Sequence, residues 1–240
     1  MKIDIHTHII PENWPDFESK FGYGGWISLD HYKKNEAKMI KNGKSFRIIE
    51  CNCWDPLVRI DECKKTNVDV QVLSTIPALF NYWAKPDDAL FTSKFINDHI
   101  SMIVNDHPKH FLGLGTLPMQ DEKKAILELE RCIKELGLAG IQIGSNINGL
   151  NLNEPSVLSI FEAARDMGAS VFVHPWDIMG RHEMEKYWLP WLVGMPAETS
   201  RAICSMIFGG VFEQLPDLRV AFAHGGGAFP ATVGRIQHGF

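Results

Sequence analysis

Short apolar segments alternate with longer amphipathic segments along most of the chain. The apolar segments are rich in Val, Ile and Phe, which is typical of strands buried in a parallel sheet. We predict six strands, one at the chain start "MKIDIHTH" and the others over residues 68–76, 111–117, 140–145, 170–175 and 219–227. Because amphipathic stretches bounded by Asp, Pro and Gly separate them, the pattern predicts strands that alternate with helices.

Five helices are predicted between the strands, and a sixth begins at the end of the chain. The first follows Asp55 and Pro56, an N-cap residue with proline at the first helical position. The others are expected over residues 86–107, 121–136, 155–167 and 197–212. Residues 9–54 show no clean periodicity and are interpreted as a segment inserted over the end of the first strand. The alternation predicts an α/β fold, either a barrel or a doubly wound sheet.

Composition and charge exclude several classes of protein. The 240 residues are 45% hydrophobic, which is too apolar for a disordered chain. There are 24 basic and 29 acidic residues and no basic tract, which argues against nucleic acid as a partner. The chain start does not have the pattern of a signal peptide, and the longest charge-free apolar stretch, residues 202–212, is too short for a membrane span. We therefore expect a cytoplasmic protein with no membrane partner.

Four of the ten histidines follow predicted strands at their C-terminal ends. His6 and His8 close the first strand, His174 the fifth and His224 the sixth. Residues two apart on a strand project to the same side, so His6 and His8 can converge on one point. Both α/β architectures place their chemistry at this end of the strands. A single histidine here is commonly a hydrogen-bonded core residue, but four at one edge favour a metal site.

Coordination chemistry suggests how these histidines divide their roles. A catalytic zinc takes three protein ligands and leaves a position open for water. We predict that His6, His8 and His174 hold the metal and that His224 acts as a general base, although the sequence does not decide which histidine stays off the metal. Asp177 is expected either to orient a ligand histidine or to cap a loop. The remaining histidines are expected to be exposed: His31, His99, His107, His110, His182 and His238.

An aromatic stretch, "YWLPWLVGMPAETS", begins at Tyr187 and carries no charge until Glu198. It is interpreted in two ways, as a rigid packed loop before a helix or as an aromatic wall over a planar substrate. In the second interpretation Trp191 contacts the substrate.

Several motifs along the chain carry a family resemblance, among them "MKIDIHTH", "CWDP", "FVHPWD", "YWLPWLVGMPAET" and "FAHGGGAFPATVGRIQHGF". Together they resemble the metal-dependent decarboxylases of the amidohydrolase superfamily, in particular the family that acts on 2-amino-3-carboxymuconate 6-semialdehyde. The likeness runs from Met1 to Phe240. It implies a TIM-type (β/α)8 barrel and a zinc-dependent, non-oxidative decarboxylation in tryptophan and kynurenine degradation, which diverts the substrate from quinolinate formation.

The resemblance also implies roles by position. His6, His8 and His174 look like ligands of one Zn²⁺ per subunit, with another divalent metal as the alternative, and His224 looks like the residue that activates a water molecule on the metal. Arg47 looks like a contact of a substrate carboxylate. Arg235 resembles an arginine that enters the neighbouring subunit's site, which implies a homodimer acting on a small dicarboxylate.

The sequence departs from the family at one point. The family's barrel has eight strands, whereas six are predicted here, so we expect a single barrel domain that is truncated after the sixth strand, with the insertion at about residues 9–54. The aspartate that completes the family's metal site has no counterpart, and this chain alone is expected to be weak or inactive. The alternatives are a related decarboxylase of a hydroxybenzoate-type acid, a metal-dependent hydrolase and an inactive metal-binding fragment.

Overall fold

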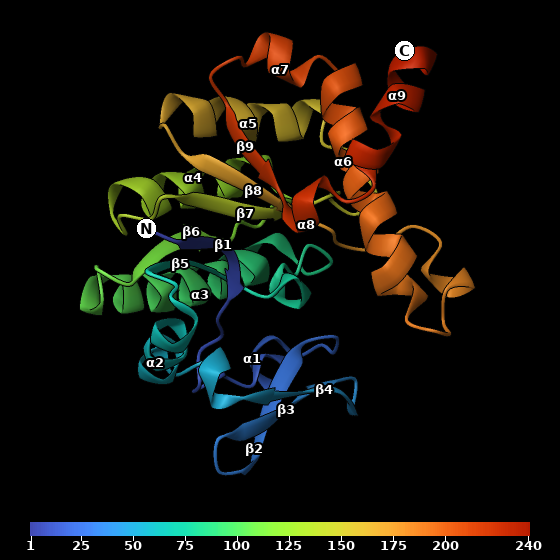
Figure 1. Ribbon diagram of the computed structural model, residues 1–240. Coiled ribbons are helices and arrows are strands. Elements are labelled where there is room, and N and C mark those ends of the chain that lie inside the picture. Colours follow the sequence, from blue (N-terminus) through green and yellow to red (C-terminus); the bar gives the residue numbers. More distant parts are fainter.

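A sheet of six parallel strands forms the centre of the computed structural model, which describes all 240 residues (Figure 1). The strand order β1-β5-β6-β7-β8-β9 follows the chain without reversal, as in a barrel and unlike a doubly wound sheet. The predicted α/β fold is confirmed. The strands are β1 (Ile3–His8), β5 (Val70–Ser74), β6 (Phe111–Gly115), β7 (Gly140–Gly144), β8 (Ser170–His174) and β9 (Arg219–Phe222).

Helices connect successive strands and pack along the sheet (Figure 1). The long helices are α2 (Pro56–Thr66), α3 (Pro86–Asp106), α4 (Glu122–Lys134), α5 (Pro155–Asp166), α6 (Met195–Phe208) and α9 (Phe229–Gly239). The predicted N-cap of α2 is confirmed, because the Asp55 carboxylate accepts from the amides of Leu57 and Val58. None of the helices combines the length and the apolar character needed to cross a bilayer.

Two predicted boundaries are wrong because of backbone turns near the C-terminal end. The helix expected over residues 197–212 is two helices, since α6 ends at Phe208 and the short α7 (Val211–Gln214) follows Gly210, whose φ is 68°. The last strand ends at Phe222, not at Gly227. Beyond it the chain turns sharply in α8 (Ala223–Gly226), where His224 has a φ of 55°. A left-handed residue ends either kind of regular structure.

The inserted segment contains regular structure that its sequence did not predict. It forms the short helix α1 (Phe17–Phe21) and an antiparallel sheet of β2 (Ile27–Lys33), β3 (Glu36–Lys41) and β4 (Lys44–Glu50). The buried residues Ala37, Met39 and Ile49 pack into the same core cluster as α3. Most other side chains of β2 and β4 are exposed, and a bulge after Met39 interrupts the alternation. The sequence signal for strands is correspondingly weak.

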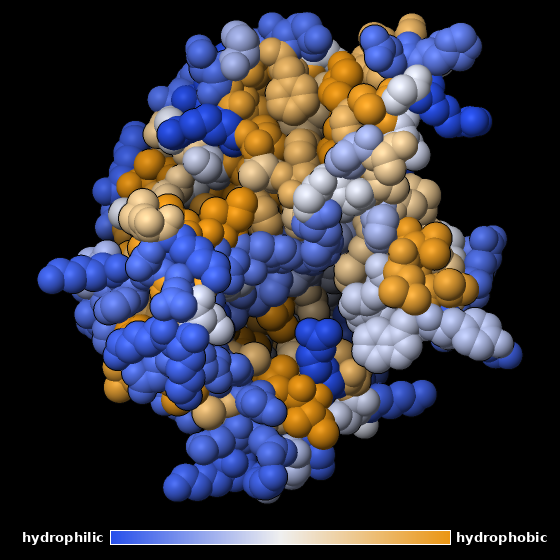
Figure 2. Space-filling model, in the orientation of Figure 1, coloured by the Kyte–Doolittle hydropathy of each residue, from blue (hydrophilic) through white to orange (hydrophobic).

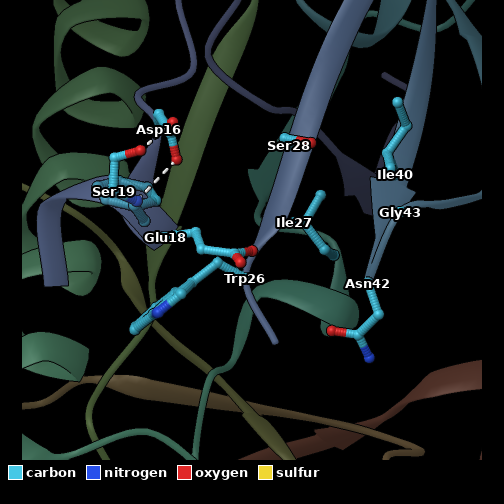
Figure 3. A pocket seen from close by; sticks show the side chains of 10 residues that line it. Asp16, Glu18, Ser19, Trp26, Ile27, Ser28, Ile40, Asn42 and Gly43 are labelled. Carbon is cyan, nitrogen blue, oxygen red and sulfur yellow. Dashed lines mark hydrogen bonds between the residues drawn. The ribbon is translucent and has the colours of Figure 1, made fainter. Parts of the chain in front are cut away.

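A surface pocket of about 350 Å³ lies between α1 and this small sheet (Figure 3). Its lining includes Asp16, Trp26, Ile27 and Asn42. The Asp16 carboxylate accepts bonds from the amide and hydroxyl of Ser19 and so caps α1. No strand-end histidine lines this pocket, so it is separate from the predicted metal site.

The expectation that the other histidines are exposed is wrong for His99, His107 and His110, which are partly buried. His99 is the clearest case. It lies on α3 with its Nε2 atom buried and without a hydrogen-bond partner. Burial lowers the pKa of His99 to about 4. The folded protein therefore holds this ring uncharged at neutral pH.

The pKa of His99 predicts acid sensitivity. Between pH 6.5 and 4 the unfolded chain binds a proton at His99 that the folded chain does not, so the free energy of unfolding falls as the pH falls. Between pH 7 and pH 5 the free energy of unfolding is expected to fall by about 1–2 kcal/mol less in His99→Leu than in the wild type, as measured by urea unfolding at each pH. The exposed His182→Leu serves as the control. An equal loss in the wild type and His99→Leu contradicts the prediction.

Candidate metal centre

The carboxyl ends of β1, β8 and β9 bring four imidazole rings together. The ring centroid of His6 lies 5.0 Å from the centroids of His8, His174 and His224. The centroid of His174 lies 5.3 Å from that of His8 and 5.1 Å from that of His224. Since β1 and β9 are the outermost strands in the sheet order, curvature of the sheet is what brings their ends to one place.

Backbone carbonyls orient two of these rings. Nδ1 of His8 donates to the carbonyl of Thr75 at 2.9 Å, and Nδ1 of His174 donates to the carbonyl of Pro175 at 2.9 Å. A carbonyl only accepts, so in the neutral ring the proton is on Nδ1 and the lone pair is on Nε2. This is the tautomer in which a histidine binds a metal through Nε2. No hydrogen bond joins His174 to Asp177, so Asp177 does not orient this ring.

Burial keeps the cluster uncharged. It lowers the pKa of His174 to about 2, and together with the proximity of His6 it lowers the pKa of His8 to about 3. Burial also lowers the pKa of His6 and of His224. Neutral imidazole is the form that binds a metal ion, so at pH 7 these rings need not lose a proton first.

The donor atoms fit a divalent transition metal. The Nε2 atoms of His6 and His8 are 3.2 Å apart, and one ring nitrogen each of His6, His174 and His224 lie within 4.8 Å of one another. Two nitrogen ligands of a tetrahedral zinc are about 3.3 Å apart, given bonds of about 2.0–2.1 Å. An all-imidazole set also suits the first-row divalent ions in general. His224 approaches as closely as the predicted ligands, so the structure presents four candidate ligands.

A buried polar layer beneath the rings was missed by the sequence analysis. The Ser74 hydroxyl lies 3.2 Å from Nδ1 of His8 and donates to the carbonyl of Thr7 at 2.8 Å. Gln142 is fully buried and its side-chain amide donates to the carbonyl of Thr75 at 2.9 Å. Ser74 also contacts the Gln142 side-chain oxygen. The available signal was a polar residue within each of two apolar strands.

A second buried polar group joins the loops that follow β7 and β8. The Glu198 carboxylate on α6 is fully buried and accepts from Ser145, Asn146 and the amide of Met179. It also pairs with Arg201. This carboxylate therefore fixes the loop after β8 that leads to the Trp-rich segment. The sequence analysis treated Glu198 only as the first charge after the aromatic residues.

The Trp-rich segment itself is largely exposed. Trp191 lies in a short π-helical stretch, Pro190–Gly194, and its ring centroid is 5.1 Å from that of Trp188. Figure 2 shows apolar side chains of this region on the surface at the right of the view. The exposed fractions are 80% for Tyr187, 70% for Trp188, 45% for Trp191 and 67% for Leu192.

The two predicted arginines are also exposed. Arg47 lies on β4 and pairs in register with the buried Met39, so it shares the face of the small sheet that packs toward the barrel. Arg235 lies on α9, which has no buried residue. No hydrogen bond joins either arginine to the four histidines.

The family model described as amidohydrolase matches residues 3–239. The chain therefore belongs to the amidohydrolase family. It is 62% identical over 240 residues to 2-amino-3-carboxymuconate-6-semialdehyde decarboxylase of Dictyostelium discoideum, and the match covers the whole chain and 67% of that relative. The enzyme of the same name from Caenorhabditis elegans is 37% identical, with the whole chain and 72% of that relative covered. The relatives are decarboxylases, which are carbon–carbon lyases.

Solved structures agree with the fold and with a metal centre. IDCase of Metarhizium anisopliae superposes with a TM-score of 0.79 at 22% identity, over 99% of this chain and 68% of that one, which supports the predicted amidohydrolase barrel. The 5-carboxyvanillate decarboxylase of Novosphingobium aromaticivorans superposes with a TM-score of 0.71 at 27% identity. Its structure was solved in complex with manganese, and this chain spans 52% of its length. A divalent metal is thus supported.

The histidine cluster predicts metal binding that depends on His174. We expect the purified chain to retain about one Zn²⁺ after removal of loosely held ions, because its imidazoles are neutral and converge. The substitution His174→Ala is expected to abolish retention, as measured by elemental analysis of protein shown to be folded by circular dichroism. The exposed His182→Ala is the control. Equal metal content in wild type and His174→Ala, or none in either, contradicts the prediction.

Proposed function

We propose that this chain carries the active site of a zinc-dependent decarboxylase that acts on 2-amino-3-carboxymuconate 6-semialdehyde in tryptophan and kynurenine degradation and diverts it from quinolinate formation. The observation that carries the proposal is the convergence of four neutral imidazoles at the strand ends, in a chain 62% identical to a decarboxylase of that name. A cytoplasmic location belongs to the same proposal.

His6, His8 and His174 are the proposed ligands. Two of them are oriented by carbonyls so that Nε2 faces the cluster. When bound, a divalent ion would supply positive charge that polarises the substrate and stabilises its negatively charged groups. Zinc is proposed because three imidazoles form a known catalytic zinc set, with another divalent ion as the alternative.

His224 is proposed to transfer the proton that replaces the carboxylate on the substrate. Its side chain is exposed, and the left-handed backbone after β9 places its ring beside those of His6 and His174. We propose that a proton delivered from this side adds to the substrate carbon that carries the leaving carboxylate. The bond to the carboxylate then breaks as carbon dioxide, and its electron pair restores the conjugated system, so one proton replaces one carboxylate.

Arginines are proposed to bind the substrate's carboxylates. Arg47 offers a planar fork that binds a carboxylate with two hydrogen bonds, and it lies on the barrel-facing side of the small sheet. Trp191 is proposed to form part of an aromatic wall over the planar substrate. Arg235, exposed on α9, is proposed to reach the site of a second subunit in a homodimer.

A hydroxybenzoate-type substrate is not favoured. The 5-carboxyvanillate decarboxylase is 27% identical to the chain, against 62% for the semialdehyde decarboxylase.

Turnover tests the proposed reaction. The zinc-loaded chain is expected to release carbon dioxide from 2-amino-3-carboxymuconate 6-semialdehyde faster than the spontaneous reaction, at a rate below that of the longer relatives. His224→Ala is expected to lower this rate by about 100-fold or more while the metal content stays the same, because a positioned acid–base group contributes about that factor. Stopped-flow absorbance and carbon dioxide trapping provide the readouts. Faster release from 2,6-dihydroxybenzoate than from the semialdehyde contradicts the proposed substrate.

Ligand binding tests Arg47 independently of turnover. Maleate presents two carboxylates on adjacent alkene carbons, as the proposed substrate does. Arg47→Ala is expected to weaken maleate binding by about 10-fold or more, and Arg47→Lys by less, because lysine keeps the charge but loses the fork. Calorimetry on the zinc-loaded chain measures the affinities, with the monocarboxylate crotonate as the control ligand. If Arg47→Ala binds maleate as tightly as the wild type, Arg47 does not contact the carboxylates.

A further inference from the structure

Arg59 is a buried cation without a carboxylate partner. It lies on α2 with 8% of its surface exposed, and no salt bridge includes it. Burial lowers its pKa, but a guanidinium stays charged at neutral pH. A buried charge is destabilising unless its hydrogen-bond donors are paired. The acceptors that surround the guanidinium therefore indicate the role of Arg59 in the structure.

The guanidinium binds three segments that are far apart in the sequence. Nη2 donates to the backbone carbonyl of His8 at 2.6 Å and to that of Asn52 at 2.6 Å, and Nε donates to the same Asn52 carbonyl at 3.1 Å. Nη1 donates to the side-chain oxygen of Gln71 at 3.3 Å. His8 ends β1, Gln71 lies on β5, and Asn52 lies in the 3-10 turn Cys51–Cys53 that closes the inserted segment.

The end of β1 needs such support. β1 pairs only with β5, and its register shifts between Asp4 and Thr7, just before His8. Ladder hydrogen bonds alone therefore hold this strand end less regularly than they hold a central strand such as β7, which pairs on both sides. A charge-assisted bond to the His8 carbonyl is among the stronger hydrogen bonds available to fix that residue.

We propose that Arg59 is a positioning residue for the metal centre. It fixes the backbone of His8, so that the imidazole stays directed at the cluster, and it ties that residue to the inserted segment that carries Arg47. The inference rests on the proposed function only through the metal site and not through the substrate.

Metal affinity tests this role. Arg59→Lys keeps the charge but cannot donate to three acceptors at once. Arg59→Met loses the charge and all of the hydrogen-bond donors. We expect Arg59→Lys to weaken Zn²⁺ binding by about 10-fold and Arg59→Met by up to about 100-fold, the range for partners that orient a metal ligand. Competition with a chromogenic chelator gives the dissociation constants, and Co²⁺ absorption reports any change in ligand geometry.

The matched control is Arg131→Lys. Arg131 is also a largely buried arginine, but it pairs with Glu128 and Asp98 between α3 and α4. Its replacement is expected to lower stability and to leave the Zn²⁺ affinity and the Co²⁺ spectrum unchanged. If folded Arg59→Lys and Arg59→Met bind Zn²⁺ as the wild type does, with the same Co²⁺ spectrum, the positioning role is wrong and Arg59 is only structural.

Two further measurements cover the other outcomes. If the Arg59 variants do not fold, Gln71→Met removes one acceptor, and an affinity about threefold weaker or more is expected, whereas an unchanged affinity overturns the proposal. If the wild-type chain holds no metal, histidine-ring ¹H–¹⁵N spectra test the positioning role of Arg59 instead. The proposal requires the His8 resonances to change in Arg59→Lys and not in Arg131→Lys. A chain without decarboxylase activity but with these effects contradicts the proposed function and leaves the role of Arg59 intact.

Discussion

The candidate site depends on the close approach of four imidazoles that must all stay neutral. With ring centroids about 5 Å apart, two charged rings would repel strongly in a buried setting. Burial prevents this by lowering every pKa in the cluster. Because backbone carbonyls accept hydrogen bonds from the Nδ1–H groups of His8 and His174, the Nε2 lone pairs of these rings face the other rings. Lone pairs directed at one another are poorly satisfied without a shared cation, and this makes a metal ion the natural occupant.

The surrounding structure supplies the conditions for that approach. The curved parallel sheet brings the ends of its first and last strands together. Beneath the rings, Ser74 contacts Nδ1 of His8, and Gln142 donates to the Thr75 carbonyl that accepts from this nitrogen. On the other side, Glu198 joins the loops beyond β7 and β8 to α6. The proposed metal ligands therefore lie at strand ends, while the exposed groups proposed to bind substrate lie on the inserted segment, the Trp-rich segment and α9.

The central barrel strands β7 and β8 were predictable because both are buried on both faces and read as continuous apolar runs. The small sheet was not, since β2 and β4 are mostly exposed and rich in charged residues. The four histidines could be found because they end predicted strands. Ser74, Gln142 and Arg59 were missed, since a polar residue within an apolar strand or a helix does not reveal its partner until the chain is folded. His99 was expected to be exposed because a single histidine in a helix does not show that it will be buried.

His8 is where the two parts of the protein meet. Its imidazole belongs to the cluster, and its carbonyl shares the Arg59 guanidinium with Asn52 at the end of the inserted segment. Movement at the end of the inserted segment would therefore reach the cluster through this buried charge, in addition to the peptide bond that joins His8 to the start of the segment at Ile9. Arg59 thus connects the strand ends proposed to hold the metal to the insertion that carries Arg47, the proposed contact of a substrate carboxylate. In the proposed enzyme, the metal chemistry then comes from the strands and the choice of substrate from the insertion.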